Sequence, residues 1–263
     1  MEIREFSQES DRDCWLTKIG ESDWRAGTYL HGLLSDGSFY KHCGTKSRLF
    51  LLTEGRDLIS FCTLAEHDEV PDSSLGPWVG FVYTFPRYRG KRRIGKLIER
   101  AYAIAKKEGQ KNLYVSTDQP GLYEKFGFSF MQNMKDTWGN DTLIYRMPVE
   151  DKDYSSILGK TVSGRIDRPL GSAHPRHPDM IYPINYGYVD GIIAGDGMEQ
   201  DVYLLGPDGP VSEFSGPVVA VYHRLNDLED KWIVSADGRT RSEEEILSAI
   251  GFQEQYFMGE LYL

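Results

Sequence analysis

The sequence has few cysteines and no long apolar run, and both absences restrict the class of protein. Its three cysteines, Cys14, Cys43 and Cys62, are scattered and lack the Cys-x-x-Cys spacing of a zinc site. They argue against a disulfide framework and predict free thiols. No apolar stretch approaches the roughly 20 residues that a membrane span needs, and the polar first residues resemble no targeting peptide. We therefore expect a cytoplasmic protein that does not bind membranes.

Positive charge is scarce in the second half of the chain. Residues 151–263 contain 9 Lys and Arg against 19 Asp and Glu, so this half carries the whole net charge of −10. In the neutral first half, residues 86–111 hold ten cations and two anions. A patch of this size indicates a small anionic ligand, because a nucleic-acid surface is usually broader. A solvated helix face is the alternative.

A polar segment, residues 148–160, separates two patterns of secondary structure, and we interpret it as a linker. It divides the chain into domains of residues 1–150 and 151–263. In the first, strands alternate with helical patterns, which predicts an α/β fold. The expected strands are 48–55, 57–65, 77–85, 112–117 and 142–149, and the expected helices are 95–109 and 121–128.

The second domain consists of short strand-like runs separated by turns such as GDG, PDGP and ADG. Only residues 241–263 have a helical pattern, with Ser242 as an N-cap and Glu245 three residues later. This pattern predicts a small β-rich barrel or sandwich with a C-terminal helix.

The basic patch begins between the expected strand 77–85 and the expected helix 95–109. Five of the seven residues from Arg87 to Arg93 are cationic, and glycines occupy positions 90 and 95. The first N–H groups of a helix have no internal acceptor, and glycine lets the backbone approach an anion closely. The segment therefore predicts a site for a diphosphate that needs no metal.

This segment, RGKRRIGKLIE (89–99), resembles the acetyl-CoA loop of the GNAT superfamily of N-acetyltransferases, usually Arg/Gln-x-x-Gly-x-Gly/Ala. Arg93 occupies the central glycine position here, and Arg89 lies six residues before Gly95 instead of five. GLYEKFGF (121–128) resembles the superfamily's Leu-Tyr-x-x-x-Gly-Phe segment. The resemblance implies a central mixed sheet in which the strand before the loop separates from its neighbour.

The resemblance also implies roles for particular residues. Acetyl-CoA would contact the strand and the loop at Phe81, Val82, Tyr83, Arg89, Gly90, Lys91, Arg92, Arg93, Ile94 and Gly95. Tyr123 would donate a proton to the departing CoA thiolate; a packing role in the core is the alternative.

A general base must accept a proton from the acceptor amine. The segment AEHDEV (65–70) follows a strand and offers Glu66, His67, Asp68 and Glu69, and Asp118 is a further candidate. We select Glu66, with a charged hairpin tip as the alternative. The acceptor is a small-molecule amine that the sequence does not identify. The aromatic residues that could line its pocket are Trp15, Trp24, Tyr29 and Trp78.

The second half is similar to the soluble inorganic pyrophosphatases. IYPINYGYVDGIIAGDGMEQDVYLLG (181–206) matches their Tyr-Pro-x-Asn-Tyr-Gly-Tyr motif, and NDLEDKW (226–232) resembles their second acidic segment. The similarity implies a closed β-barrel. It also implies Mg²⁺ as a cofactor, with Asp196, Asp201, Asp227 and Asp230 as ligands, and a phosphate pocket formed by Tyr182, Tyr186 and Arg168.

Two departures favour a degenerate barrel. Met198 occupies the position of the middle aspartate of the metal-binding motif, and a thioether is a poor ligand for Mg²⁺. The upstream lysine, glutamate and arginine of the pyrophosphatases are replaced by residues 165–179, which contain two histidines and three arginines.

We therefore expect an acetyl-CoA-dependent N-acetyltransferase with a degenerate pyrophosphatase-like domain. One alternative is a bifunctional enzyme whose second domain is a Mg²⁺-dependent pyrophosphatase or phosphohydrolase. Another is a sensor that binds acetyl-CoA without catalysis. We expect no nucleic-acid partner, and we consider a homodimer.

Overall fold

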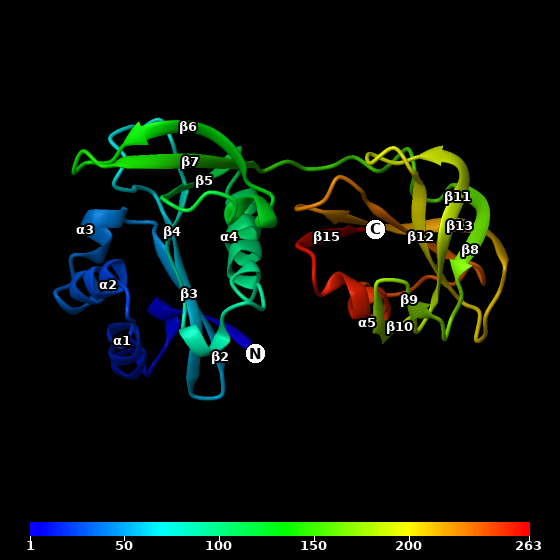
Figure 1. Ribbon diagram of the computed structural model, residues 1–263, viewed down its shortest axis with the longest axis horizontal. Helices are drawn as coiled ribbons and strands as arrows, with labels where there is room; N and C mark the ends of the chain where they lie inside the picture. The colour runs from blue at the N-terminus through cyan, green and yellow to red at the C-terminus, as the bar shows by residue number, and fades with distance from the viewer. The chain divides into compact units, whose positions relative to one another are not determined.

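The computed structural model describes residues 1–263, and the chain divides into two compact units, Met1–Asp151 and Lys152–Leu263 (Figure 1). The division lies one residue after the expected boundary. We expected residues 148–160 to form a linker, but residues 154–158 belong to the second unit. Tyr154 is buried, and Ile157 and Leu158 pack in the core of that unit.

The first unit contains a seven-stranded mixed sheet in the order β1-β2-β3-β4-β5-β7-β6. In this sheet β4 and β5 are parallel, and all the other neighbouring strands are antiparallel. The expected mixed sheet is therefore confirmed. Its strands are β1 (Glu2–Glu5), β2 (Arg48–Glu54), β3 (Asp57–Ala65), β4 (Trp78–Thr84), β5 (Asn112–Thr117), β6 (Ser129–Lys135) and β7 (Asp141–Pro148). The sequence did not indicate β6, an edge strand whose side chains are mostly exposed.

Helices cover the two faces of this sheet (Figure 1). On one face lie α1 (Arg12–Gly20), α2 (Arg25–Ser35) and α3 (Phe39–Cys43), and on the other lies α4 (Gly95–Lys107). The apolar side chains that α4 buries include the expected stripe of Leu97, Ile98, Ala101, Tyr102 and Ala105. Short 3₁₀ helices occur at η1 (Phe6–Gln8), η2 (Pro86–Tyr88) and η3 (Tyr123–Phe126).

The second unit is a closed barrel, as expected. Five strands form a continuous ring because β13 pairs with both β8 and β14. The ring consists of β8 (Thr161–Arg168), β11 (Asn185–Ile193), β12 (Glu199–Leu205), β14 (Lys231–Ser235) and β13 (Glu213–Arg224). A small hairpin, β9 (Ala173–His174) and β10 (His177–Ile181), precedes β11.

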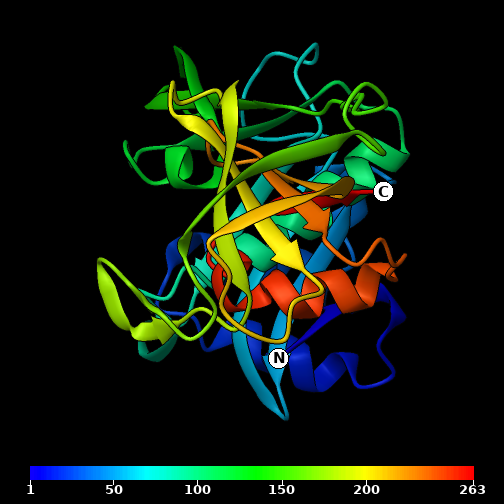
Figure 2. The ribbon, with the colours of Figure 1, turned by 90° about the vertical axis from the view of Figure 1, so that its right-hand side faces the viewer.

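The C-terminal helix α5 (Glu243–Glu254) lies against the barrel (Figure 2). Its residues Ile246 and Ile250 pack in the tyrosine-rich core of the barrel. Its expected capping box is confirmed: Ser242 accepts the N–H of Glu245, and Glu245 accepts the N–H of Ser242. The expectation of a helix as far as residue 263 was wrong. Residues Gly259–Tyr262 form β15, which pairs with β13.

The three cysteines are free thiols, as expected, and Cys43 and Cys62 are buried. None of the helices combines the length and the apolar character that crossing a bilayer requires.

Candidate active site

The strands β4 and β5 separate from each other, and their separation places a site in the first unit. They pair only at Trp78 and Tyr114, near the start of both strands. Beyond this point β4 contains a bulge: the pairing with β3 shifts between Gly80 and Tyr83, and Phe81 has a φ of 46°. The backbone of residues 80–84 is therefore not paired with β5, as the resemblance to the acetyltransferases implies.

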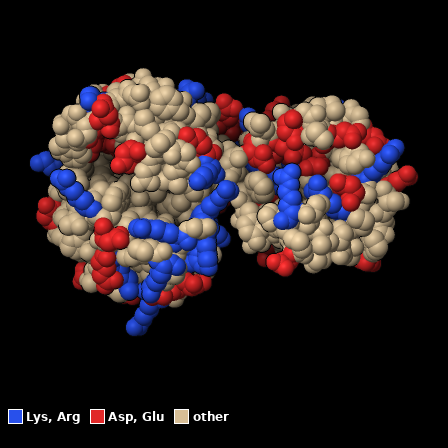
Figure 3. Space-filling view, viewed as in Figure 1, with Lys and Arg blue, Asp and Glu red and all other residues tan.

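A cavity of about 960 Å³ lies at this separation. Its walls come from β4, the end of β5, the segment entering α4, α2, the loop after β3 and the β6–β7 turn. Figure 3 shows a hollow on this unit, and basic side chains gather over the entrance to α4.

The segment entering α4 has the properties of an anion site. The backbone N–H groups of residues 90–94 have no acceptor within the protein. Gly90 and Arg92 adopt positive φ angles of 80° and 50°, a conformation that turns successive N–H groups toward one side. The Nη1 atom of Arg93 is buried without a hydrogen-bond partner, although Arg93 lines the cavity. An incoming diphosphate would satisfy these donors.

Eight of the ten expected acetyl-CoA contacts line the cavity. Lys91 and Gly95 do not: Lys91 is exposed, and Gly95 is buried as the first residue of α4. Arg89 is already engaged, since it donates to the carbonyl of Thr84 at 2.9 Å and lies 3.5 Å from Asp23.

Tyr123 lines the cavity from η3 and is 6% exposed. Burial raises the pKa of its hydroxyl well above the ordinary value, with smaller contributions from Cys62, Asp68 and Asp118. The hydroxyl forms no hydrogen bond within the protein, so it stays protonated and free to donate.

The structure does not bring the selected base, Glu66, into the cavity. A bend follows β3, and the Glu66 carboxylate accepts the N–H of Lys46 at 2.9 Å, against Gly44. His67, Asp68 and Glu69 line the cavity instead, as does Asp118.

Asp68 has the surroundings of a proton acceptor. Ser116 donates to its Oδ1 at 2.7 Å, and its Oδ2 lies 3.6 Å from the point where a Cβ would stand on Gly80. Burial raises the pKa of the Asp68 carboxyl, and the Ser116 hydrogen bond opposes this only in part. A carboxylate with a raised pKa is a stronger base near neutral pH.

Thr63 is a second polar group beside Gly80. It is fully buried, its hydroxyl has no partner, and it lines the cavity. Its Oγ1 lies 3.0 Å from the same Cβ position on Gly80, so it approaches Asp68 at the cavity wall. The sequence analysis missed Thr63, although a polar residue in the buried strand β3 was the available signal.

Two of the four expected aromatic lining residues, Trp24 and Tyr29, line the cavity. Trp24 stacks on Tyr83 with ring centroids 5.9 Å apart, and the ring centroids of Tyr29 and Phe81 lie 6.2 Å apart. Trp15 and Trp78 belong to the core instead, with exposures of 6% and 1%.

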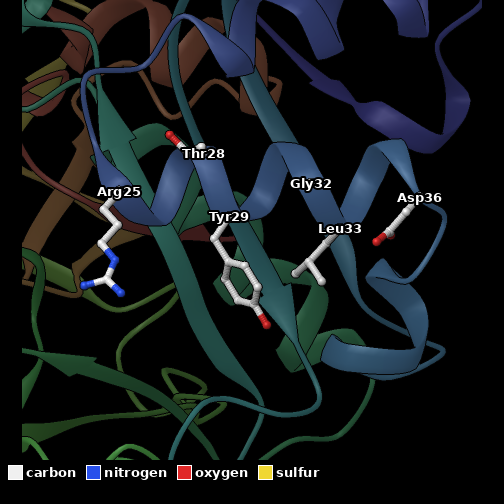
Figure 4. A pocket seen from close by; sticks show the side chains of 6 residues that line it. All are labelled: Arg25, Thr28, Tyr29, Gly32, Leu33 and Asp36. Atoms are coloured by element: carbon white, nitrogen blue, oxygen red, sulfur yellow. The ribbon is translucent and has the colours of Figure 1, made fainter.

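A shallower groove of about 450 Å³ lies along α2. Its lining residues, from Arg25 to Asp36, all belong to this helix or its C-cap, and Tyr29 borders both this groove and the cavity (Figure 4). No second element converges on it, so the chemistry lies in the cavity.

In the second unit, the four expected Mg²⁺ ligands do not converge. Each carboxylate has its own partner: Asp196 accepts the N–H of Met198, Asp201 binds Lys231 and Tyr186, Asp227 binds Arg224, and Asp230 binds His223 and Tyr154. No group of three His, Cys, Asp or Glu side chains is placed to hold a metal ion. The residues present therefore do not fit a multi-metal site.

A lysine occupies the acidic cluster of the barrel. The Nζ atom of Lys231 lies 2.5 Å from Asp201 and 2.5 Å from Glu229, and its side chain is 3% exposed. Burial raises the pKa of Asp201, but Lys231 outweighs this effect and keeps it below its ordinary value. Burial raises the pKa of Glu229 to about 7.

The three expected phosphate-pocket residues lie together. Arg168 donates from Nη1 to the Tyr182 hydroxyl at 3.2 Å, and its guanidinium carbon lies 4.7 Å from the centre of the Tyr186 ring. His174 stacks on Tyr182 with ring centroids 6.0 Å apart.

Comparisons with known proteins address the first unit most directly. The family model "Acetyltransferase (GNAT) domain" matches residues 71–131, which include β4, the α4 entrance and η3. The expected resemblance to the GNAT superfamily is confirmed. No curated protein matches the chain.

Solved structures similar to the GNAT-like unit include two acetyltransferases. An aminoglycoside 6′-N-acetyltransferase complexed with coenzyme A is 12% identical, with a TM-score of 0.46, covering 58% of this chain and 99% of that one. A GNAT family acetyltransferase from Elizabethkingia anophelis with acetyl-CoA bound is 15% identical, with a TM-score of 0.38, covering 56% and 97%.

Inorganic pyrophosphatases, which residues 181–206 resemble, also occur among the similar structures. The pyrophosphatase from Neisseria gonorrhoeae is 20% identical, with a TM-score of 0.30, covering 40% of this chain and 81% of that one.

Proposed function

We propose that the GNAT-like unit binds acetyl-CoA and transfers its acetyl group to a small-molecule amine. The observation that carries this proposal is the run of five unpartnered N–H groups at residues 90–94, beside the unpartnered Arg93 Nη1. This donor set suits a diphosphate, and it borders the same cavity as Tyr123 and Asp68.

Cofactor contacts divide between the loop and the strand. The N–H groups of residues 90–94 and the guanidinium of Arg93 would hold the diphosphate. The unpaired backbone of β4 at Phe81, Val82 and Tyr83 would hydrogen-bond the pantetheine arm. Bound in this way, acetyl-CoA supplies an activated thioester.

Asp68 takes the place of Glu66 as the proposed base. It accepts one proton from the acceptor ammonium, so that the neutral nitrogen can attack the thioester carbon and form the C–N bond. As the C–S bond breaks, Tyr123 donates its hydroxyl proton to the departing sulfur. The nitrogen loses its second proton to solvent, Asp68 releases its proton to solvent, and Tyr123 regains one from solvent, so one proton is released per turnover.

For the barrel unit we propose a binding or structural role without Mg²⁺-dependent hydrolysis. Each expected ligand already has a partner, and the ammonium group of Lys231 binds Asp201 and Glu229 of the acidic cluster. A phosphate group would bind without a metal at the pocket formed by Arg168, Tyr182 and Tyr186.

Replacing Tyr123 by Phe tests the acetyltransferase proposal. Release of CoA is measured with a panel of primary amines, and acetyl-CoA affinity is measured by calorimetry. We expect kcat to fall about a hundredfold because the thiolate loses its proton donor, while acetyl-CoA affinity changes little.

The matched control is Tyr114→Phe, a buried tyrosine of the same unit that does not line the cavity, which should keep its activity. Equal turnover in the Tyr123→Phe variant would assign Tyr123 a packing role. Tight acetyl-CoA binding without turnover of any amine would support the sensor alternative instead.

A further inference from the structure

We infer that the acceptor carries a second positive charge, held outside the reaction centre by Asp136 and Trp138 of the β6–β7 turn. This inference rests on the proposed function and adds the substrate class: an aliphatic diamine or a longer amine with a second cationic group. Three observations on the side of the cavity formed by α2, the loop after β3 and the β6–β7 turn support it.

The first observation is an exposed tryptophan at the cavity. Trp138 lines the cavity yet is 64% exposed, so most of its side chain is open to solvent. The turn that carries it is well ordered: Asp136 accepts hydrogen bonds from the N–H groups of Trp138 and Asn140 and from the Asn140 amide. A tryptophan face presented in this way is the preferred aromatic surface for an ammonium group.

The second observation is an uncompensated negative charge beside this ring. Asp136 also lines the cavity, and all its hydrogen-bond donors are neutral. The Asn140 side-chain hydrogen bond, with the backbone donors, holds the pKa of Asp136 below its ordinary value. Its neighbour Lys135 binds Asp141 at 2.6 Å instead, so Asp136 has no cation partner in the protein.

Glu69 strengthens the negative character of the same wall. Thr137 of the turn donates its N–H to the Glu69 carbonyl at 2.7 Å and its hydroxyl to the Glu69 carboxylate at 2.6 Å. The other oxygen of this carboxylate lies 2.7 Å from Nε2 of His42. These contacts hold the turn against the loop that carries Asp68. They therefore fix the position of Asp136 relative to Asp68.

The third observation indicates where the reacting amine lies. Thr63 is fully buried, and its hydroxyl has no partner in the protein, although it lines the cavity beside Gly80 and Asp68. A buried hydroxyl without a partner is costly, and an amine between Thr63 and Asp68 would satisfy it. The reacting nitrogen and the second ammonium group therefore occupy different ends of the same wall.

Other charged groups of the cavity do not provide the second charge themselves. Arg89, Arg92 and Arg93 lie at the α4 entrance, where the diphosphate is expected, and Lys125 belongs to η3 beside Tyr123. Asp118, which follows β5, adds a further carboxylate to the lining. A second ammonium group on the acceptor would give Asp136 the cation partner that it lacks within the protein.

The test compares two amines of equal length, 1,4-diaminobutane and 1-aminobutane, with the full chain and acetyl-CoA. We expect kcat/KM to favour the diamine by about tenfold or more, because the second ammonium gains both the carboxylate and the ring. Trp138→Leu and Asp136→Asn should each reduce this preference several-fold. Trp138→Leu changes an exposed side chain, so its folding is not at risk.

Asp72→Asn is the matched control: the Asp72 carboxylate accepts hydrogen bonds from the N–H and hydroxyl of Ser74 and does not line the cavity. It should keep the wild-type preference. Equal kcat/KM for the two amines, or an unchanged preference in both turn variants, would overturn this inference and leave acetyl transfer intact. Acetyl-CoA binding without acetylation of any amine would overturn the proposed function instead.

Discussion

At the scale of single residues, Asp68 is the proposed base, and it combines burial with a position on the cavity wall. The same burial that suits it for proton transfer opposes its ionised form. Its conversion to the ionised form therefore requires a higher pH than an ordinary aspartate. Function and stability should respond in opposite directions when this carboxylate is removed.

Replacing Asp68 by Asn tests whether this carboxylate accelerates the reaction while it lowers the stability of the fold. The amide keeps an oxygen for the Ser116 hydrogen bond but cannot accept the proton, so we expect kcat to fall by about two to three orders of magnitude. In the wild type, kcat should decline on the acidic side with an apparent pKa above that of an ordinary aspartate.

The thermal stability of the Asp68→Asn variant at neutral pH should equal or exceed that of the wild type. A carboxyl whose pKa is raised on folding favours the folded state at low pH, and this contribution is lost as pH rises through the raised value. Asparagine does not titrate, so the variant does not lose stability in this way as pH rises. A large fall in melting temperature with unchanged kcat would show that Asp68 has a structural role only.

Residue chemistry could be read from the sequence only where a motif specified it. The unpartnered loop at residues 90–94 and Tyr123 were expected from their motifs, and the cavity contains both. The choice between Glu66 and Asp68 was not readable. Both are acidic, and a bend after Ala65 decides which carboxylate turns toward Lys46 and which toward Ser116.

At the scale of secondary-structure elements, periodicity predicted those elements with one strongly apolar face. The helix α4 and the strands β2, β3, β4, β5 and β7 were all expected. The strand β6 was missed because its side chains are mostly exposed at the sheet edge. Residues Gly259–Tyr262 were predicted as part of a helix, but in the structure they pair with β13. This is a long-range contact that the local sequence does not encode.

The junction of β12 and β14 in the barrel contains a charge cluster with a testable pH response. One ammonium group, Lys231, faces two carboxylates, and the pKa of Glu229 is raised to about 7 by burial. The folded barrel therefore binds a proton that the unfolded chain releases near the ordinary value of 4.5. Between these two values, the free energy of unfolding should decrease as pH rises.

Replacing Glu229 by Gln should remove this pH dependence, because the amide does not titrate. We expect the wild-type barrel to lose on the order of 2 kcal/mol between pH 5 and pH 7.5, relative to the variant. Hydrogen exchange of amides in β12 and β14, corrected for intrinsic rates, reports on the barrel alone. Parallel pH profiles for the two proteins would exclude Glu229 as the titrating group.

At the scale of the whole molecule, the chain combines two units that differ in charge and in fold. The GNAT-like unit contains the cavity and the donors for a diphosphate, and the acidic barrel has no convergent metal ligands. Met198, in place of the motif's middle aspartate, led us to expect a degenerate barrel. In the structure each of the four expected carboxylate ligands has its own partner.

The central claim is that the α4 entrance binds the diphosphate of acetyl-CoA, and calorimetric titration of acetyl-CoA into the full chain tests it most directly. Wild type is compared with Arg93→Gln, which removes a cationic group that lines the cavity at the α4 entrance. The control is Arg100→Gln, which changes an exposed arginine of α4 that does not line the cavity. Circular dichroism verifies that each variant is folded.

We predict one binding site in the wild type and in Arg100→Gln, and binding weaker by about tenfold or more in Arg93→Gln because the diphosphate loses a charged donor. No binding by the wild type, or equally tight binding by Arg93→Gln, would contradict the account.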